Sequence, residues 1–255
     1  MSFNMQQFML KDKVALVTGG SRGIGRAIAL GLASAGARVA ITSRKQADLD
    51  EVQAELAGLG AESLAVAAHL GRMEDITRLI DAVMQKFGRI DVLVNNAATN
   101  PTVDPAIDYT ERAWDAIMNL NLKGLFFLSQ GAARIMKGQS GGSILNIASV
   151  EGIRPSILSV YGISKAGVIH ATRVMAKEWA SYNIRVNAIA PGITRTRFAE
   201  FWWKDPELLK TASSMTPLGR TAEPDEMVGA VIFLSSDASS YVTGQVLAVD
   251  GGISI

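Results

Sequence analysis

Short apolar segments alternate with longer segments of helical spacing along most of the chain. The apolar runs predict strands over residues 13–18, 38–42, 63–68, 90–94, 142–149, 184–190 and 245–249. The apolar residues between them recur at helical spacing and predict helices over residues 24–35, 47–59, 73–87, 110–136, 159–182 and 223–234. Glycines at positions 36, 60 and 88 follow the first three of these helices, where a helix commonly ends.

This alternation of strand and helix favours a parallel sheet with right-handed crossover connections. The strands are apolar over most of their length, which suits a sheet that helices cover on both faces. No repeat, low-complexity tract or linker interrupts the 255 residues. The sequence therefore predicts an α/β fold with a doubly wound sheet in three α/β/α layers, formed by a single domain over residues 1–255.

Composition narrows the range of functions. The hydrophobic content of 48% supports a substantial core. The net charge of +1 does not decide for or against a polyanionic partner, but no run of like charges reaches five residues, which argues against a nucleic-acid-binding arm and so against a nucleic-acid partner. The absence of cysteine excludes disulfides and thiolate chemistry, and neither His69 nor His170 lies in a metal-binding pattern. No apolar run approaches the ~18 residues of a membrane helix, and the first ten residues do not form a signal-peptide pattern. We therefore expect a cytoplasmic protein with no metal site and no membrane partner.

A glycine-rich loop follows the first predicted strand and leads into the first helix. Glycine allows both the sharp turn and a close approach of the backbone to a phosphate, and the helix N-terminus favours an anion there. The pattern predicts a dinucleotide pyrophosphate site, although a tight turn without ligand is the alternative. The residues expected to contact the cofactor in this loop are Gly19, Ser21, Arg22, Gly23, Ile24 and Gly25.

Basic residues stand where the identity of the dinucleotide is decided. NAD-specific sites place Asp or Glu after the second strand, whereas a basic residue there suits the 2′-phosphate of NADP. Residues 41–45 contain no acid and include Arg44, and Arg22 lies within the glycine loop. A solvated surface arginine is the alternative interpretation of Arg44. The sequence thus predicts NADP(H) ahead of NAD(H) as the cofactor.

A tyrosine and a lysine lie four residues apart on one predicted helix, at Tyr161 and Lys165. A neighbouring ammonium stabilises phenolate and lowers a tyrosine pKa from its usual value near ~10 toward the range useful for acid–base catalysis. Ser149 ends the preceding strand, at the sheet edge where open α/β folds bind ligands. Its hydroxyl could polarise a substrate carbonyl, or it could simply cap the strand end.

These motifs, in this order and spacing, resemble the short-chain dehydrogenase/reductase family over roughly residues 12–252. The resemblance rests on the glycine loop, Tyr161 and Lys165, Ser149, and four further segments: Asn95-Asn96-Ala97-Ala98, Asn119-Leu120-Asn121, Asn187 with Pro191-Gly192, and Val249-Asp250-Gly251-Gly252. Segments such as His69-Leu70-Gly71 and Ser43-Arg44-Lys45 look like the NADP-dependent carbonyl and retinal reductases of that family.

The resemblance implies seven parallel strands in a Rossmann-like order and an enzyme that interconverts a carbonyl and an alcohol by hydride transfer. It implies a tetrad in which Tyr161 exchanges the proton, Ser149 orients the carbonyl, Lys165 tunes Tyr161 and binds the nicotinamide ribose, and Asn121 holds a water. Beyond the glycine loop and Arg44, it implies cofactor contacts from Leu70, Asn96, Ala97, Ala98, Tyr161, Lys165, Pro191, Gly192, Ile193 and Thr196. It also implies a homotetramer with an interface formed by residues 110–136 and 159–182, where we expect apolar residues such as Leu122, Leu125, Phe126, Phe127, Val168, Ile169 and Met175 to need a second covering surface.

Three positions depart from the family pattern. Ala98 stands where the family usually has glycine, and His69 stands where an acid often contacts adenine. Ser149 and Tyr161 are twelve residues apart, one fewer than usual. We therefore expect a narrower ribose site and a different loop after Ser149, and the role of His69 stays open.

The segment at about residues 193–220 covers the substrate in this family, and here it carries Phe198, Phe201, Trp202 and Trp203. These rings favour an apolar or aromatic substrate, unless they pack a short helix onto the core or form a subunit interface. The main functional prediction is an NADP(H)-dependent carbonyl reductase acting on a small-molecule carbonyl or alcohol. The alternatives are a 3-oxoacyl-carrier-protein reductase, an NAD-dependent sugar or polyol dehydrogenase, and a cofactor-binding regulator without catalysis.

Overall fold

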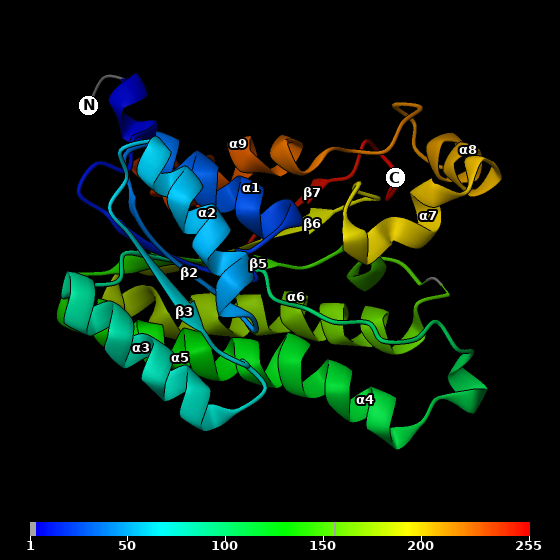
Figure 1. Cartoon of the computed structure of the whole chain (residues 1–255), viewed down its shortest axis with the longest axis horizontal. Coiled ribbons are helices and arrows are strands. Elements are labelled where there is room, and N and C mark those ends of the chain that lie inside the picture. Colours follow the sequence, from blue (N-terminus) through cyan, green and yellow to red (C-terminus); the bar gives the residue numbers. More distant parts are fainter. Residues whose placement is uncertain (1–3, 156) are drawn as a thin grey trace.

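Seven parallel strands form one sheet in the order β3-β2-β1-β4-β5-β6-β7 (Figure 1). The computed structural model describes residues 4–155 and 157–255, without the side chain of Phe201. The order reverses between β1 and β4, as in Rossmann-like sheets, so the predicted fold class is confirmed. The strands are β1 (Val14–Thr18), β2 (Arg38–Ser43), β3 (Ser63–Ala67), β4 (Val92–Asn95), β5 (Gly142–Ile147), β6 (Ile184–Pro191) and β7 (Val246–Val249).

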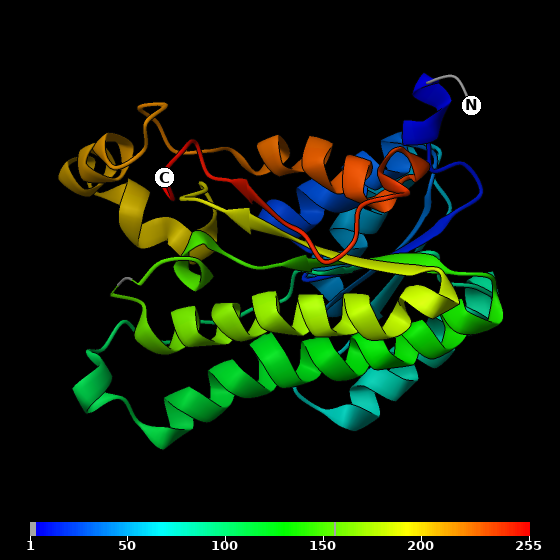
Figure 2. The ribbon, with the colours of Figure 1, turned by 180° about the vertical axis from the view of Figure 1, so that it is seen from behind.

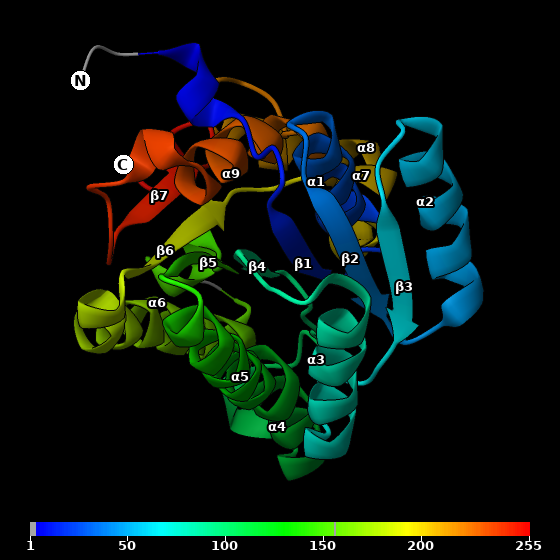
Figure 3. The same ribbon diagram turned by 90° about the vertical axis from the view of Figure 1, so that its left-hand side faces the viewer.

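Helices cover both faces of the sheet, which is plain when the molecule is viewed along the strands (Figure 3). One face carries α1 (Gly23–Ser34), α2 (Gln46–Gly58) and α9 (Val228–Ser235). The other face carries α3 (Met73–Phe87), α4 (Glu111–Met118), α5 (Leu125–Gly138) and α6 (Ser159–Trp179). Two short helices, α7 (Glu200–Lys204) and α8 (Pro206–Ser214), lie beyond the layers at the right of Figure 1.

The core is divided by the sheet because successive strand residues point to opposite faces. In β1, Val14 and Leu16 pack against the side of α3, α5 and α6, whereas Ala15 and Val17 pack against the side of α1, α2 and α9. All four side chains are fully buried. This two-sided burial explains why the strands are uniformly apolar in sequence.

The helix predicted over residues 110–136 is interrupted. A π-helical segment, Asn119–Gly124, separates α4 from α5, although the two follow one another beneath α6 as a nearly continuous rod (Figure 2). The π segment lies where the start of α5 packs against the loop after β3. The two backbones are so close that a Cβ on Gly124 would lie 2.2 Å from the carbonyl oxygen of Leu70. Single π turns are frequently found at functional sites, and this one carries Asn121.

Several apolar residues expected at a subunit interface are instead covered by the chain itself. Leu125, Val168, Ile169 and Met175 belong to the core on the α5 and α6 side. The prediction that these four residues need a second covering surface was wrong, because α5 and α6 bury them in the core of the same chain. Phe127 remains 39% exposed. Other large apolar side chains exposed on α4 and α6 are Trp114, Ile163 and Val174.

No helix among the described residues combines the length and apolar character needed to cross a membrane.

Candidate active site

A cleft of about 1210 Å³ lies at the carboxyl ends of the strands, where the strand order reverses. Its volume is large for a small-molecule site. The residues that line it include the glycine loop and Trp202 of α7. Every residue predicted to contact the cofactor lines it: Gly19, Ser21, Arg22, Gly23, Ile24, Gly25, Arg44, Leu70, Asn96, Ala97, Ala98, Tyr161, Lys165, Pro191, Gly192, Ile193 and Thr196.

The glycine loop forms one end of this cleft and has no room for side chains at two positions. Gly19 has φ +64°, and a Cβ there would lie 2.7 Å from the side-chain nitrogen of Asn96. A Cβ on Gly25 would lie 2.1 Å from the carbonyl oxygen of Gly19. The loop therefore keeps its backbone at the surface of the cleft, next to the N-terminus of α1, as a pyrophosphate requires.

Thr18 joins the glycine loop to the segment after β4. Its hydroxyl accepts hydrogen bonds from the main-chain nitrogens of Asn96 and Ala97, at 2.8 and 2.9 Å. The Asn96 side chain donates in return to the Thr18 carbonyl oxygen at 2.8 Å. The sequence motif begins with Thr18 but did not predict this positioning role, because only the fold brings β1 and β4 side by side.

Two arginines lie at the same end of the cleft. Arg44 follows β2 and Arg22 precedes α1, and both side chains are exposed. Among the described residues, neither is paired with a carboxylate, whereas the nearby Arg26 forms an ion pair with Glu55. Their guanidinium groups are therefore available to an anion in the cleft.

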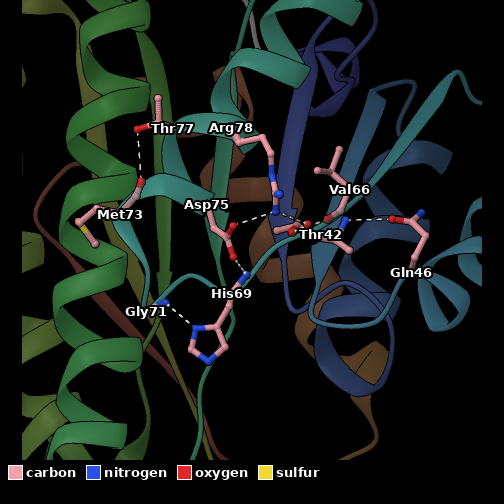
Figure 4. A network of polar contacts seen from close by, with 10 residues as sticks. Thr42, Gln46, Val66, His69, Gly71, Met73, Asp75, Thr77 and Arg78 are labelled. Atoms are coloured by element: carbon pink, nitrogen blue, oxygen red, sulfur yellow. Dashed lines mark hydrogen bonds and ion pairs between the residues drawn. The ribbon is translucent and has the colours of Figure 1, made fainter.

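The loop carrying His69 is fixed by a polar network (Figure 4). The main-chain nitrogen of His69 donates to the Asp75 carboxylate at 2.8 Å, and Arg78 donates to the other oxygen of that carboxylate at 2.8 Å. The His69 ring accepts a hydrogen bond from the Gly71 nitrogen at 3.2 Å through Nδ1. Nδ1 is thus unprotonated and Nε2 carries the ring proton, in a side chain that lines the cleft. His69 can therefore donate a hydrogen bond where an acid would only accept one.

Tyr161, Lys165 and Ser149 all line the cleft, away from the glycine loop. The Lys165 ammonium lies 5.6 Å from the centre of the Tyr161 ring and donates to the Ile147 carbonyl oxygen at 2.6 Å. Both side chains are almost completely buried. Helix α6 carries Tyr161 and Lys165 on one face, and the end of β5 leads into Ser149.

Burial governs the titration of this pair. It raises the pKa of Tyr161, while a hydrogen bond with Ser149 lowers it and the charge of Glu151 raises it further. Burial lowers the pKa of Lys165 to about 8. The sequence predicted a lowered Tyr161 pKa; the direction in the structure is the opposite, because desolvation of the phenolate outweighs the hydrogen bond with Ser149.

The Ser149 hydroxyl makes two contacts at once. Its hydroxyl accepts a hydrogen bond from the Glu151 nitrogen at 3.2 Å and caps the short 3₁₀ turn Val150–Gly152. The same hydroxyl lies within hydrogen-bonding reach of the Tyr161 phenol. The capping and functional interpretations of Ser149 are therefore compatible.

Asn121 does not line the cleft. Its side chain accepts from the Thr99 nitrogen at 2.8 Å and donates to the Thr99 carbonyl oxygen and the Ser164 hydroxyl, at 3.0 and 3.1 Å. The amide thereby ties the loop after β4 to α6, one turn from Tyr161. In this structure Asn121 positions other residues of the site.

Aromatic residues cover the other side of the cleft. The ring of Phe198 packs at 5.4 Å from the ring of Tyr161, and Trp202 lines the cleft. Trp203 donates its indole N–H to the Thr196 carbonyl oxygen at 2.9 Å and so anchors the segment. The predicted side chain of Phe201 lies outside the described residues.

Sequence reasoning missed Glu151. This residue lines the cleft two positions after Ser149, and its side-chain Oε2 is buried without a hydrogen-bond partner. Its position in the short turn after β5, two residues beyond Ser149, could have drawn attention to it, but nothing in the sequence indicates that its Oε2 atom is buried.

The residues present fit a nicotinamide dinucleotide. The crowded glycines leave a backbone cradle for a pyrophosphate, unpaired arginines lie beside it, and a buried lysine and tyrosine lie at the far end. No group of three or more His, Cys, Asp or Glu among the described residues could hold a metal ion.

Comparison with known proteins agrees with this geometry. A family described as enoyl-(acyl carrier protein) reductase matches residues 19–254. The chain is 41% identical to 2-dehydro-3-deoxy-D-gluconate 5-dehydrogenase of Escherichia coli (strain K12), over 97% of this chain and 98% of the relative. It is 38% identical to human dehydrogenase/reductase SDR family member 4, over 95% of this chain and 88% of the relative. It is 44% identical to 3-oxoacyl-[acyl-carrier-protein] reductase FabG of Thermotoga maritima, over 96% and 99%.

Solved structures give the same result. A gluconate 5-dehydrogenase from Burkholderia cenocepacia J2315, in complex with NADP and tartrate, superposes with a TM-score of 0.93 at 34% identity, covering 97% of each chain. The resemblance inferred from the motifs is thereby confirmed. The chain belongs to the short-chain dehydrogenase/reductase family.

Proposed function

We propose that this protein is an NADP(H)-dependent oxidoreductase that interconverts a ketone or aldehyde and an alcohol, with Tyr161 as the general acid and base. The observation that carries the proposal is the meeting of Tyr161, Lys165 and Ser149 in one cleft with the glycine loop. Relatives of this chain named as dehydrogenases and reductases support the reaction class.

The protein residues have separate tasks in carbonyl reduction. The bound nicotinamide supplies the hydride for the carbonyl carbon. Tyr161 gives its phenolic proton to the carbonyl oxygen, and Ser149 donates a hydrogen bond to that oxygen and orients it. The raised pKa of Tyr161 keeps the phenol protonated before reaction, as an acid must be. In alcohol oxidation the same oxygen must accept a proton, and the Lys165 ammonium then favours the phenolate.

The cofactor assignment rests on the adenosine end of the cleft. Arg22 and Arg44 are exposed and unpaired with carboxylates, and no acid occupies residues 41–45. Several similar structures were solved with NADP, which supports the same choice. We assign NADP(H) as the preferred cofactor and NAD(H) as a weaker substitute.

A panel of ketones and aldehydes incubated with NADPH tests the proposal directly. The expected result is loss of reduced-nicotinamide absorbance with at least one carbonyl substrate, and its near-complete disappearance in Tyr161→Phe. Turnover by Tyr161→Phe at the rate of the unmodified protein would rule out the assigned mechanism.

The Thermotoga maritima relative favours a second candidate, reduction of a 3-oxoacyl group on its carrier protein. A carrier would need surface cations near the cleft entrance. Lys137 is a surface cation, but it lies over the Tyr182 ring at 4.1 Å, at the opposite end of α5 from the π segment. Comparing a carrier-bound 3-oxoacyl thioester with the same acyl group on a small thiol distinguishes the two candidates.

We also assign the protein to the cytoplasm as a homotetramer, with the segment at about residues 193–220 closing over the substrate. The exposed apolar side chains Trp114, Phe127, Ile163 and Val174 support an interface on α4, α5 and α6. Light scattering tests the assembly, since a particle of the 27.1 kDa chain mass would exclude it.

A further inference from the structure

The short turn after Ser149 lies directly against the backbone of α6. This 3₁₀ turn, Val150–Gly152, has Ser149 as its N-cap residue, and the Gly152 nitrogen donates to the Ser149 carbonyl oxygen at 3.0 Å. A Cβ on Gly152 would lie 2.6 Å from the carbonyl carbon of Lys165, 2.8 Å from its carbonyl oxygen and 2.8 Å from the nitrogen of Ala166. All three distances are well inside van der Waals contact, so only glycine allows the turn to lie this close to the helix.

A second glycine makes the reciprocal contact from α6. Gly162 follows Tyr161 in the helix, and a Cβ there would lie 2.9 Å from the carbonyl oxygen of Glu151 in the turn. Neither Gly152 nor Gly162 has a φ in the left-handed region, so alanine could adopt the backbone conformation of either residue. Lack of space, and not conformation, therefore requires glycine at both positions.

The contact between turn and helix lies outside the cleft. Neither glycine lines the cleft, so a methyl group at either position would not obstruct a substrate directly. The turn nevertheless touches α6 at Lys165 and beside Tyr161. The Ser149 hydroxyl at the start of the turn forms a hydrogen bond with the Tyr161 phenol. The closeness of turn and helix thus sets the distance between these two hydroxyl groups.

Helix α6 is the fixed partner in this contact. It is 21 residues long, and its side chains Val168 and Met175 are fully buried in the core. Its Ser164 hydroxyl accepts a hydrogen bond from the Asn121 side chain at 3.1 Å, which ties the helix to the π segment. The turn is only three residues long. A clash between the two would therefore displace the turn, and Ser149 with it, because moving the helix would disturb the core.

We propose that Gly152 and Gly162 are positioning residues that hold the two catalytic hydroxyl groups close enough to contact the same carbonyl oxygen. That oxygen must lie within hydrogen-bonding reach of both hydroxyls at once, and a misplacement of about 1 Å at such a site can cost roughly 10²-fold in rate. The inference rests on the carbonyl reduction proposed for the same site. It adds to the site two residues that carry no side chain and lie outside the cleft.

Gly152→Ala tests the proposal, because its methyl group should push the turn and Ser149 away from α6. We expect kcat and kcat/KM for a carbonyl substrate to fall together by about tenfold or more, as when an interaction made only in the transition state is lost. NADPH binding, followed by fluorescence titration, should be unchanged, because the glycine loop and α6 keep their places. Gly162→Ala, whose methyl group would clash with a single oxygen, should lower kcat by a smaller factor.

Two variants in α9 separate positioning from stability. Gly229→Ala is the matched substitution, because a Cβ there would have nothing within 4 Å, and it should leave kcat unchanged. Val231→Ala removes buried methyl groups outside the cleft, so it should lower the urea concentration at which the protein unfolds and leave kcat unchanged. A crystal structure of Gly152→Ala gives a readout without turnover: the turn should lie farther from α6, and α6 itself should not move.

Failure of this inference is distinguishable from failure of the proposed function. A normal kcat in folded Gly152→Ala, or a turn that keeps its position in that crystal structure, would overturn the role of the two glycines and leave carbonyl reduction intact. Loss of NADPH binding together with kcat would overturn it as well, because the helix would then have moved. Should Gly152→Ala fail to fold, Gly162→Ala carries the same two measurements, since alanine favours a helix. If the unmodified protein reduced no carbonyl of the panel with NADPH, the proposed function would be rejected, and the distance between the two hydroxyl groups in the crystal structure would decide the inference.

Discussion

Replacing Arg44 by aspartate should reverse the cofactor preference. Arg44 follows β2, is exposed, and has no carboxylate partner among the described residues, so its charge is available to a 2′-phosphate. A hydrogen bond involving a charged group contributes roughly 1.5–3 kcal/mol, and exposure to solvent places Arg44 at the lower end. A carboxylate near the phosphate would add repulsion of about 1 kcal/mol in water. Together these effects predict a loss of roughly 70-fold in kcat/KM with NADPH.

The assay compares kcat/KM for NADPH and NADH at a fixed carbonyl concentration. Arg44→Asp should lower the value for NADPH and change the value for NADH by less than about threefold. Arg44→Gln should show only the loss of attraction, a decrease of about tenfold. Lys11→Asp is the control, since it changes the net charge equally on an exposed residue outside the cleft. Equal losses with both cofactors, or none with NADPH, would refute the assignment of Arg44 to the 2′-phosphate.

Three further substitutions test the site. Tyr161→Phe should lower kcat by at least ~10²-fold while NADPH binding, followed by fluorescence titration, persists; loss of binding would show that the phenol serves mainly the cofactor. Burial lowers the pKa of Lys165 from 10.5 to about 8, so between these pH values the unfolded chain holds a proton that the folded chain has released. Urea unfolding should therefore show the unmodified protein gaining up to about 3 kcal/mol relative to Lys165→Met as pH rises through that window, and a constant difference would contradict the burial. Gly25→Ala would place its Cβ 2.1 Å from the Gly19 carbonyl oxygen and should weaken NADPH binding at least tenfold, whereas Gly229→Ala in α9, with open space around it, should bind normally and unfold at slightly higher urea.

Much of the fold could be predicted because each of its signals is local. The uniformly apolar run of β1 reflects burial on both faces, and a glycine with φ +73° at position 88 ends α3 as expected. The interruption at Asn119–Gly124 could not be predicted, because residues 110–136 keep a helical spacing of apolar residues throughout. Its cause is tertiary: Gly124 packs against the Leu70 carbonyl oxygen of a loop that is distant in sequence.

The site shows the same division between local and tertiary information. The residue types of Tyr161, Lys165 and Ser149 are specific enough to be recognised by spacing, and the structure brings them together. The direction of the Tyr161 pKa was wrong, because spacing gives a neighbouring charge but not the extent of burial. Glu151 was missed for the same reason, since an acid in a loop is normally a solvated residue.

The contact between Gly124 and Leu70 has a consequence for redesigning the enzyme. The loop that carries His69 is in close contact with the π segment, and the π segment carries Asn121, which holds the loop after β4 and α6 together. Enlarging or reshaping the His69 loop would therefore also displace the support beneath Tyr161. Arg44 has no such link among the described contacts, because it is an exposed residue after β2 that lines the cleft. Substitutions at Arg44 can therefore change the cofactor preference while Tyr161 keeps its position. Substitutions in the His69 loop would alter the cofactor site and the position of Tyr161 together.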